Sequence, residues 1–184
     1  MKSYSDNDLI CRFSDQGGAI SDRVSDAGII NLRPHHLLCI QKFTGHGYDE
    51  AFTTHMTELV SSFVNEPGRI VKLVSGPDEL CSVCPNRLAG RCSSDEKVQR
   101  MDGAVLNICG IKAADEAADA TEESATRDGS MGETDTAVSD TYDWRILSKT
   151  AAALILHTEQ FDKVCGDCQW FELCKNTQKG LYDE

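Results

Sequence analysis

Two short cysteine segments constrain this chain more than any other feature of its sequence. Each has two cysteines separated by two residues, and a third cysteine after five or seven more. The six cysteines are Cys81, Cys84 and Cys92 in the first segment and Cys165, Cys168 and Cys174 in the second. Two intervening residues let one tight turn direct both sulfurs at one ion or cluster, while backbone amides bond to the thiolates. The pattern predicts a fold organised around a cysteine-ligated metal centre.

The spacing favours an iron–sulfur cluster over zinc. A simple zinc ribbon separates its two cysteine pairs by about 15–20 residues, whereas 80 residues lie between Cys84 and Cys165. Zinc remains an alternative, either one ion bound across the fold or two ions bound by six thiolates. A cluster usually takes four thiolates, commonly a compact triplet and a distant cysteine. We therefore expect one cluster of the [4Fe–4S] type, with structural zinc as the alternative.

Composition and charge exclude several classes of protein. The net charge of −12 argues against a nucleic-acid partner, because phosphate binding relies on clustered Lys and Arg. The longest purely apolar run, residues 151–156, is far shorter than the ~20 residues of a membrane span. No apolar segment of a secretory signal follows the N-terminus, and disulfides persist mainly in oxidising compartments. We expect a cytoplasmic metal protein with a redox or enzyme partner and no membrane association; its oligomeric state stays open.

Other side chains could complete the ligand set. In the run Arg-Pro-His-His-Leu-Leu-Cys at residues 33–39, helical spacing places His35 and His36 near Cys39. Cys39, His35 and His36 are therefore further candidate ligands, although the histidines can equally make hydrogen bonds at a helix start. Cys109 is expected to be a core thiol, and Cys11 lies in a polar segment and is expected to take no part.

The remaining pattern predicts an α+β fold, mostly helical, in one metal-binding domain at residues 31–178. We expect a disordered arm at residues 1–30 and a mobile acidic insertion at about residues 111–141. Residues 111–143 hold ten acidic and two basic side chains. Apolar residues at helical spacing predict helices at residues 34–39, 52–63, 94–106 and 142–161, the last capped by Asp143. A β-branched stretch predicts a short strand at residues 69–74.

Several motifs together resemble one protein family. They are the run at residues 33–39, the Gly-His-Gly-Tyr turn at residues 45–48 and the pairs Cys81/Cys84 and Cys165/Cys168. In this order they resemble the small prokaryotic family called domain of unknown function 1284, described as iron–sulfur-binding proteins. The resemblance covers roughly residues 31–110 and 142–178. It implies a cluster and no particular reaction.

The sequence identifies no catalytic residue. It has no glycine-rich phosphate loop, no dinucleotide fingerprint and no Gly-x-Ser-x-Gly motif. Three functions remain open. The first is an iron–sulfur protein with a redox, sensing or accessory role; the second is a structural zinc protein. The third is an enzyme in which an open cluster site binds substrate and His35 or His36 acts as acid or base.

The acidic insertion gives a first test. Because its charges repel one another and it has few large apolar groups, deletion of about residues 115–138 should leave the metal content per chain unchanged. Metal analysis of the purified deletion variant and of wild type measures this. Loss of metal or of soluble expression would show that the segment is structural.

Overall fold

The computed structural model describes residues 28–111 and 141–177 of the chain. Over these residues the protein is an α+β structure in which helices predominate over a few short strands, as the sequence predicted. The expected arm and acidic insertion fall almost wholly on residues 1–27 and 112–140, outside the described residues. No helix within the described ranges is long and apolar enough to cross a membrane.

A three-stranded sheet, in the order β1-β2-β5, joins distant parts of the chain. Strand β1 (Ile30–Leu32) runs parallel to β2 (Ile70–Leu73), and β5 (Thr141–Asp143) runs antiparallel to β2. The sequence predicted only β2, because its two neighbours are too short to show an alternating pattern. Strand β1 also begins one residue inside the segment expected to be an arm.

The predicted second and third helices are present. Helix α3 (Glu50–Asn65) buries Phe52 and Phe63, and Asp49 caps it by accepting the backbone N–H of Phe52. Helix α4 (Asp95–Cys109) buries its apolar side and ends at Gly110, whose φ of 65° is the left-handed conformation that favours glycine. In both helices a stripe of apolar residues faces the core, as the helical spacing indicated.

The long helix expected at residues 142–161 is wrong in two respects. Tyr142 belongs to β5, and the helix is divided into α5 (Trp144–Ala151), a π-helical segment η3 (Ala152–Leu156) and α6 (Gln160–Cys165). Thr158 lies between η3 and α6 and bonds to the backbone on both sides. Its hydroxyl donates to the carbonyl of Leu154 and accepts from the amide of Gln160. This turn lets α6 return and pack against α4. The predicted cap is correct: Asp143 accepts the amides of Arg145 and Ile146.

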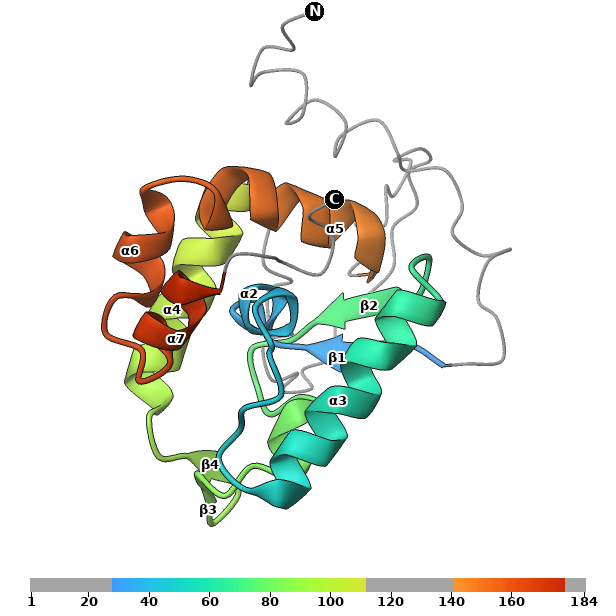
Figure 1. Cartoon of the computed structure of the whole chain (residues 1–184), viewed down its shortest axis with the longest axis vertical. Helices are drawn as coiled ribbons and strands as arrows, with labels where there is room; N and C mark the ends of the chain where they lie inside the picture. Colours follow the sequence, from blue (N-terminus) through green and yellow to red (C-terminus); the bar gives the residue numbers. More distant parts are fainter. Residues whose placement is uncertain (1–27, 112–140, 178–184) are drawn as a thin grey trace, which may run out of the picture.

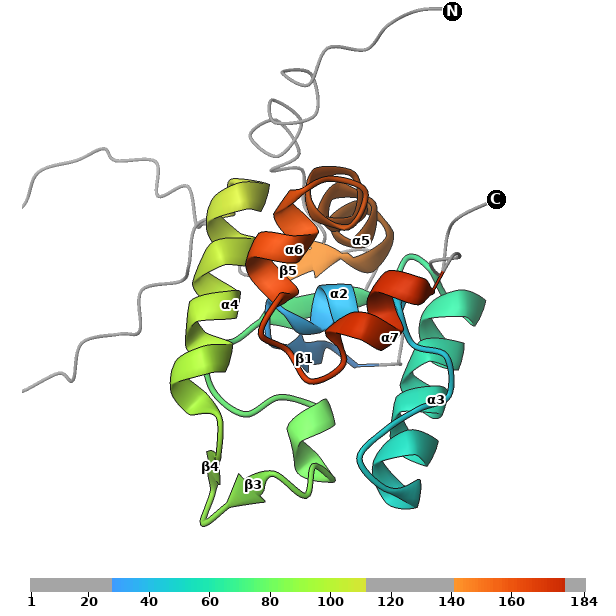
Figure 2. The same cartoon turned by 60° about the vertical axis from the view of Figure 1, so that its left-hand side comes forward.

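Helix α2 (His36–Gln41) lies at the centre of the molecule and packs against α5 and α3 (Figure 1). Pro34 fits the turn that precedes it, and Leu37, Leu38 and Ile40 are buried. Helices α4 and α6 lie side by side, and a two-stranded hairpin lies beyond the lower end of α4 (Figure 2). Its strands are β3 (Arg87–Leu88) and β4 (Arg91–Cys92). Helix α7 (Phe171–Asn176) is the last helix of the described residues.

The stack of Trp144 on Phe63 joins α5 to α3, with ring centroids 4.0 Å apart and both side chains fully buried. Replacing Trp144 by Ala should lower the free energy of unfolding by about 3–5 kcal/mol, because a large buried ring is lost and leaves a cavity. Ile146→Ala is the matched control on the same helix, since Ile146 is 41% exposed. It should change stability by only about 0.5 kcal/mol. Denaturant unfolding at equal metal content measures both, and equal losses would contradict the prediction.

Candidate metal centre

One cavity of about 170 Å³ brings the two cysteine segments together. Its wall is formed by α2, the turn at η2 (Leu80–Ser82), the β3–β4 hairpin, the start of α4 and the segment around α7. A water molecule occupies about 30 Å³ in the liquid, so the cavity can hold a group of several heavy atoms. Six cysteines line it: Cys39, Cys81, Cys84, Cys92, Cys168 and Cys174.

Cys39 on α2 lies close to the second cysteine segment. Burial raises the pKa of the Cys39 thiol well above its ordinary value, and the neighbouring Cys165, Cys168 and Cys174 raise it further. These four thiols therefore lie within electrostatic range of one another in a water-poor site. Cys165 is 7% exposed and does not itself line the cavity. Burial, together with the neighbouring thiols, raises its pKa to about 12.

The second segment is a tight turn at the end of α6. The amide of Cys168 donates to the carbonyl of Cys165 at 2.8 Å, and the amide of Cys174 donates to the carbonyl of Trp170 at 2.9 Å. Position 166, between Cys165 and Cys168, accepts only glycine, because a Cβ there would lie 2.4 Å from the carbonyl oxygen of Asp162. In the same turn Asp167 forms a solvent-exposed ion pair with Arg100 on α4.

The first segment reaches the cavity from the other side. Buried Leu80 anchors it, and the amide of Cys84 donates to the carbonyl of Cys81. The hairpin then returns the chain, so that Cys92 pairs with Arg87 across β3 and β4. The sulfur of Cys92 accepts the amide of Ser94 at 3.4 Å, an interaction common around metal-bound sulfur. Burial raises the pKa of Cys84, and Cys92 adds to the effect.

Each of the two histidines is held by a buried carboxylate. Nδ1 of His35 lies 2.7 Å from Oδ1 of Asp102, and Nδ1 of His36 lies 2.5 Å from Oδ2 of Asp78. The histidine rings are 4.2 Å apart, and both line the cavity. Because Nδ1 is occupied in each ring, Nε2 is the nitrogen left for the cavity.

Sequence reasoning missed both aspartates. A signal for Asp102 was present, since it lies within the apolar stripe of α4 with Met101 and Val105 and is buried with them. A polar residue at a core position needs a partner. For Asp78, which precedes η2 in an irregular turn, the sequence offers no comparable signal.

Opposing effects set the charges of these pairs. Burial by itself raises the pKa of Asp78, but the charge of His36 and several hydrogen bonds outweigh it and hold the pKa well below its ordinary value. The pKa of Asp102 is lowered for similar reasons, with His35 as the main partner. For His35, burial dominates and lowers the pKa to about 4, with a further contribution from His36. His35 is thus a neutral imidazole beside a carboxylate at neutral pH.

The donor set can be compared with what metals require. Among the described residues, no group of three or more Cys, His, Asp or Glu side chains is gathered around a single ion position. A zinc ion would need its sulfur ligands at about 2.3 Å from one point. A cluster instead distributes its thiolates over several irons.

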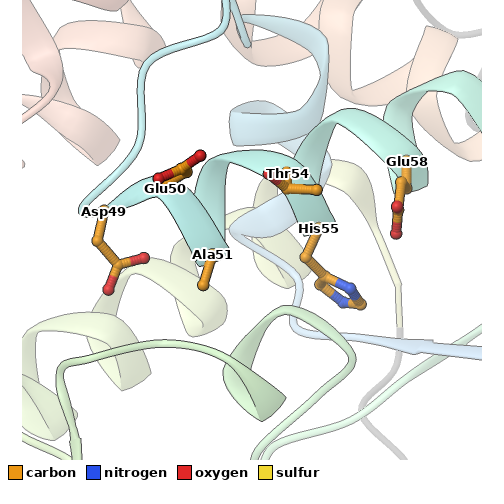
Figure 3. A pocket seen from close by; sticks show the side chains of 6 residues that line it. All are labelled: Asp49, Glu50, Ala51, Thr54, His55 and Glu58. Atoms are coloured by element: carbon orange, nitrogen blue, oxygen red, sulfur yellow. The ribbon is translucent and has the colours of Figure 1, made fainter.

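The other candidate residues lie elsewhere. Cys109 is buried in the core at the end of α4, as expected, and does not line the cavity. Cys11 lies outside the described residues. A second, shallow hollow lies on the face of α3 and carries Asp49, His55 and Glu58 (Figure 3). There Asp49 caps the helix and His55 bonds to the carbonyl of Glu79, so these side chains serve the fold.

Comparison with known proteins gives one match. The model of a family described as protein of unknown function (DUF1284) matches residues 47–174. This range covers well over half of the chain and includes both cysteine segments. The run at residues 33–39 precedes it. No curated protein and no solved structure matches.

The buried His35 predicts how stability depends on pH. In the unfolded chain it takes up a proton near pH 6.5, whereas in the fold it stays neutral until about pH 4. Protonation thus favours the unfolded state, so stability is lost as the pH falls from about 6.5 to about 4. His35→Gln should reduce this loss, with exposed His46→Gln as the control. Denaturant unfolding across this range at equal metal content measures it, and equal slopes in the two variants would contradict it.

Proposed function

We propose that this chain, which belongs to the DUF1284 family of proteins of unknown function, is an iron–sulfur protein. Its cluster is held by Cys39 together with Cys165, Cys168 and Cys174. Its role is to transfer electrons, to sense redox state or to support a partner enzyme. We further propose that it works in the cytoplasm, where a reducing environment keeps thiols available as ligands.

One observation carries this proposal: Cys39 lines the same cavity as Cys168 and Cys174 and lies within electrostatic range of all three cysteines of the second segment, although it is 126 residues from Cys165 in sequence. A compact triplet with one distant cysteine is a common ligand pattern for a four-thiolate cluster. The turn at Gly166 and the packing of α6 against α4 position the triplet, and packing of the neighbouring leucines fixes Cys39 on α2.

The surroundings also fit such a group. The thiols are soft donors, which suit iron–sulfur clusters. When bound, a cluster supplies a centre that accepts and gives up single electrons. The chain itself holds the sulfurs and limits the access of water. Tyr48 and Trp170, whose ring centroids lie 5.5 Å apart, contribute to the cavity wall where Tyr48 is 39% exposed.

Anaerobic purification followed by measurement of iron, sulfide and zinc per chain tests the metal. Iron and acid-labile sulfide in equal amounts, with broad visible absorption, are the expected result. Stoichiometric zinc without sulfide would overturn the proposal in favour of the structural zinc protein.

Two thiols provide a matched pair of variants. Cys39→Ala should lose most of its iron and sulfide, because a ligand is removed. Cys109→Ala should keep them and lose only about 1–2 kcal/mol of unfolding free energy, because a small buried group leaves a small cavity. Iron and sulfide per chain are measured for both, and full occupancy in Cys39→Ala would contradict the assigned ligand set.

A further inference from the structure

Asp78 connects His36 to the first cysteine segment. Its carboxylate is fully buried and accepts three hydrogen bonds. The donors are the amide of Arg33 at 2.7 Å, Nδ1 of His36 at 2.5 Å and the amide of Cys81 at 3.1 Å. One aspartate thus fixes both the imidazole and the start of the Cys81–Cys84 turn. The ring of His36 and this turn are therefore held close together at the wall of the same cavity.

The same contact leaves one ring nitrogen of His36 for the cavity. Nδ1 faces the carboxylate of Asp78, so Nε2 is the nitrogen that can bind a metal. Metal-bound histidines almost always have this arrangement, because the carboxylate orients the ring and increases the basicity of the ligating nitrogen. No hydrogen bond of Nε2 of His36 is found among the described residues, and the ring lines the cavity. Nε2 is available as a donor to a metal.

The first segment lacks a fourth ligand. Cys81, Cys84 and Cys92 line the cavity, but Cys39 is assigned to the second segment. Seven thiols exceed the four that one cluster takes. His36 and Cys39 are three residues apart on α2, so they lie on the same side of the helix. One helical turn thus offers one ligand to each triplet.

We propose that Cys81, Cys84, Cys92 and Nε2 of His36 hold a second iron–sulfur cluster beside the first, an inference that rests on the proposed function. Insertion of a preformed cluster changes no oxidation state: each of the three thiols gives up its proton to solvent as its sulfur binds iron, and Nε2 of His36 binds through its lone pair. Asp78 is the positioning residue. Because a neutral nitrogen replaces one thiolate, this cluster carries less negative charge and has a higher reduction potential than an all-cysteine cluster of the same type.

A cluster fits these residues better than a single ion. The first segment and His36 are not gathered around one ion position in the described part of the chain. Cys92 reaches the cavity from the hairpin and His36 from α2, so their donor atoms approach from different elements. A multi-atom core accepts ligands at separate irons, whereas a single zinc ion requires all of them at one point.

Metal stoichiometry tests the existence of two clusters. The full chain is reconstituted anaerobically with ferrous iron and sulfide, and iron and sulfide per chain are measured. The double variants Cys81→Ser/Cys84→Ser and Cys165→Ser/Cys168→Ser should each keep about half of the wild-type iron. Loss of nearly all iron in both, with the fold retained by circular dichroism, would mean one shared cluster and would overturn the inference.

Nitrogen ligation tests His36 directly and does not depend on a variant folding. Pulsed electron paramagnetic resonance of the reduced wild-type protein, with and without ¹⁵N-labelled histidine, should show hyperfine coupling from one histidine nitrogen. His36→Gln should abolish the coupling, and the matched control His46→Gln, at a histidine that also lines the cavity, should keep it. His36→Cys should keep the iron, lose the coupling and shift the potential to lower values. Coupling absent from wild type, or persisting in His36→Gln, would overturn the inference.

The two proposals fail in different ways. Wild type without iron and sulfide overturns both. Iron and sulfide for one cluster, lost in Cys39→Ala and retained in Cys81→Ser/Cys84→Ser, overturns only the second cluster and leaves the proposed function standing.

Discussion

Two buried carboxylates hold the segment that enters α2, and the rest of the structure depends on this. Asp102 accepts hydrogen bonds from Nε of Arg33 at 2.8 Å and from the amide and Nδ1 of His35. Asp78 accepts from the amide of Arg33 and from His36. Amides at a helix start have no partner within the helix, and a buried carboxylate is costly unless charged or polar groups compensate it. The amides before α2 therefore gain acceptors, and the buried carboxylates gain the donors that they need.

These bonds also decide where the cysteines lie. Asp102 belongs to α4, and Asp78 precedes η2, so the bonds fix α2 relative to both elements. Cys39 follows on α2, and the first cysteine segment follows Asp78. Helix α6, which ends at Cys165 in the second segment, packs on α4. The cavity therefore forms where three parts of the chain meet at α2. This explains how cysteines more than seventy residues apart line one space.

Burial gives these thiols a strong preference for being protonated in the absence of a cation. The pKa of Cys81 is raised to about 12, by burial first and then by the charge of Asp78. Thiolates in such a site need positive charge nearby, because a low-dielectric environment disfavours an unpaired anion. Bound iron would supply that charge and would add its binding free energy to folding. A metal bound at this site would therefore couple metal content to stability, in a chain whose net charge of −12 gives no general compensation.

The sequence by itself determined the features that rest on local chemistry. The stripe in α3, the cap at Asp143 and the membership of the two cysteine triplets follow from periodicity, hydrogen-bonding capacity and spacing between near neighbours. Local sequence patterns did not predict the strands β1 and β5 or the division of α5 from α6. Short strands are defined by their partners, and a π-helical break gains its stability from packing against other elements. Only the tertiary structure decided that Asp78 and Asp102 hold the two histidines and that Cys39 lies within electrostatic range of the second triplet. Those contacts join residues from 42 to 135 positions apart. No local pattern encodes such a meeting, because it depends on how whole helices pack.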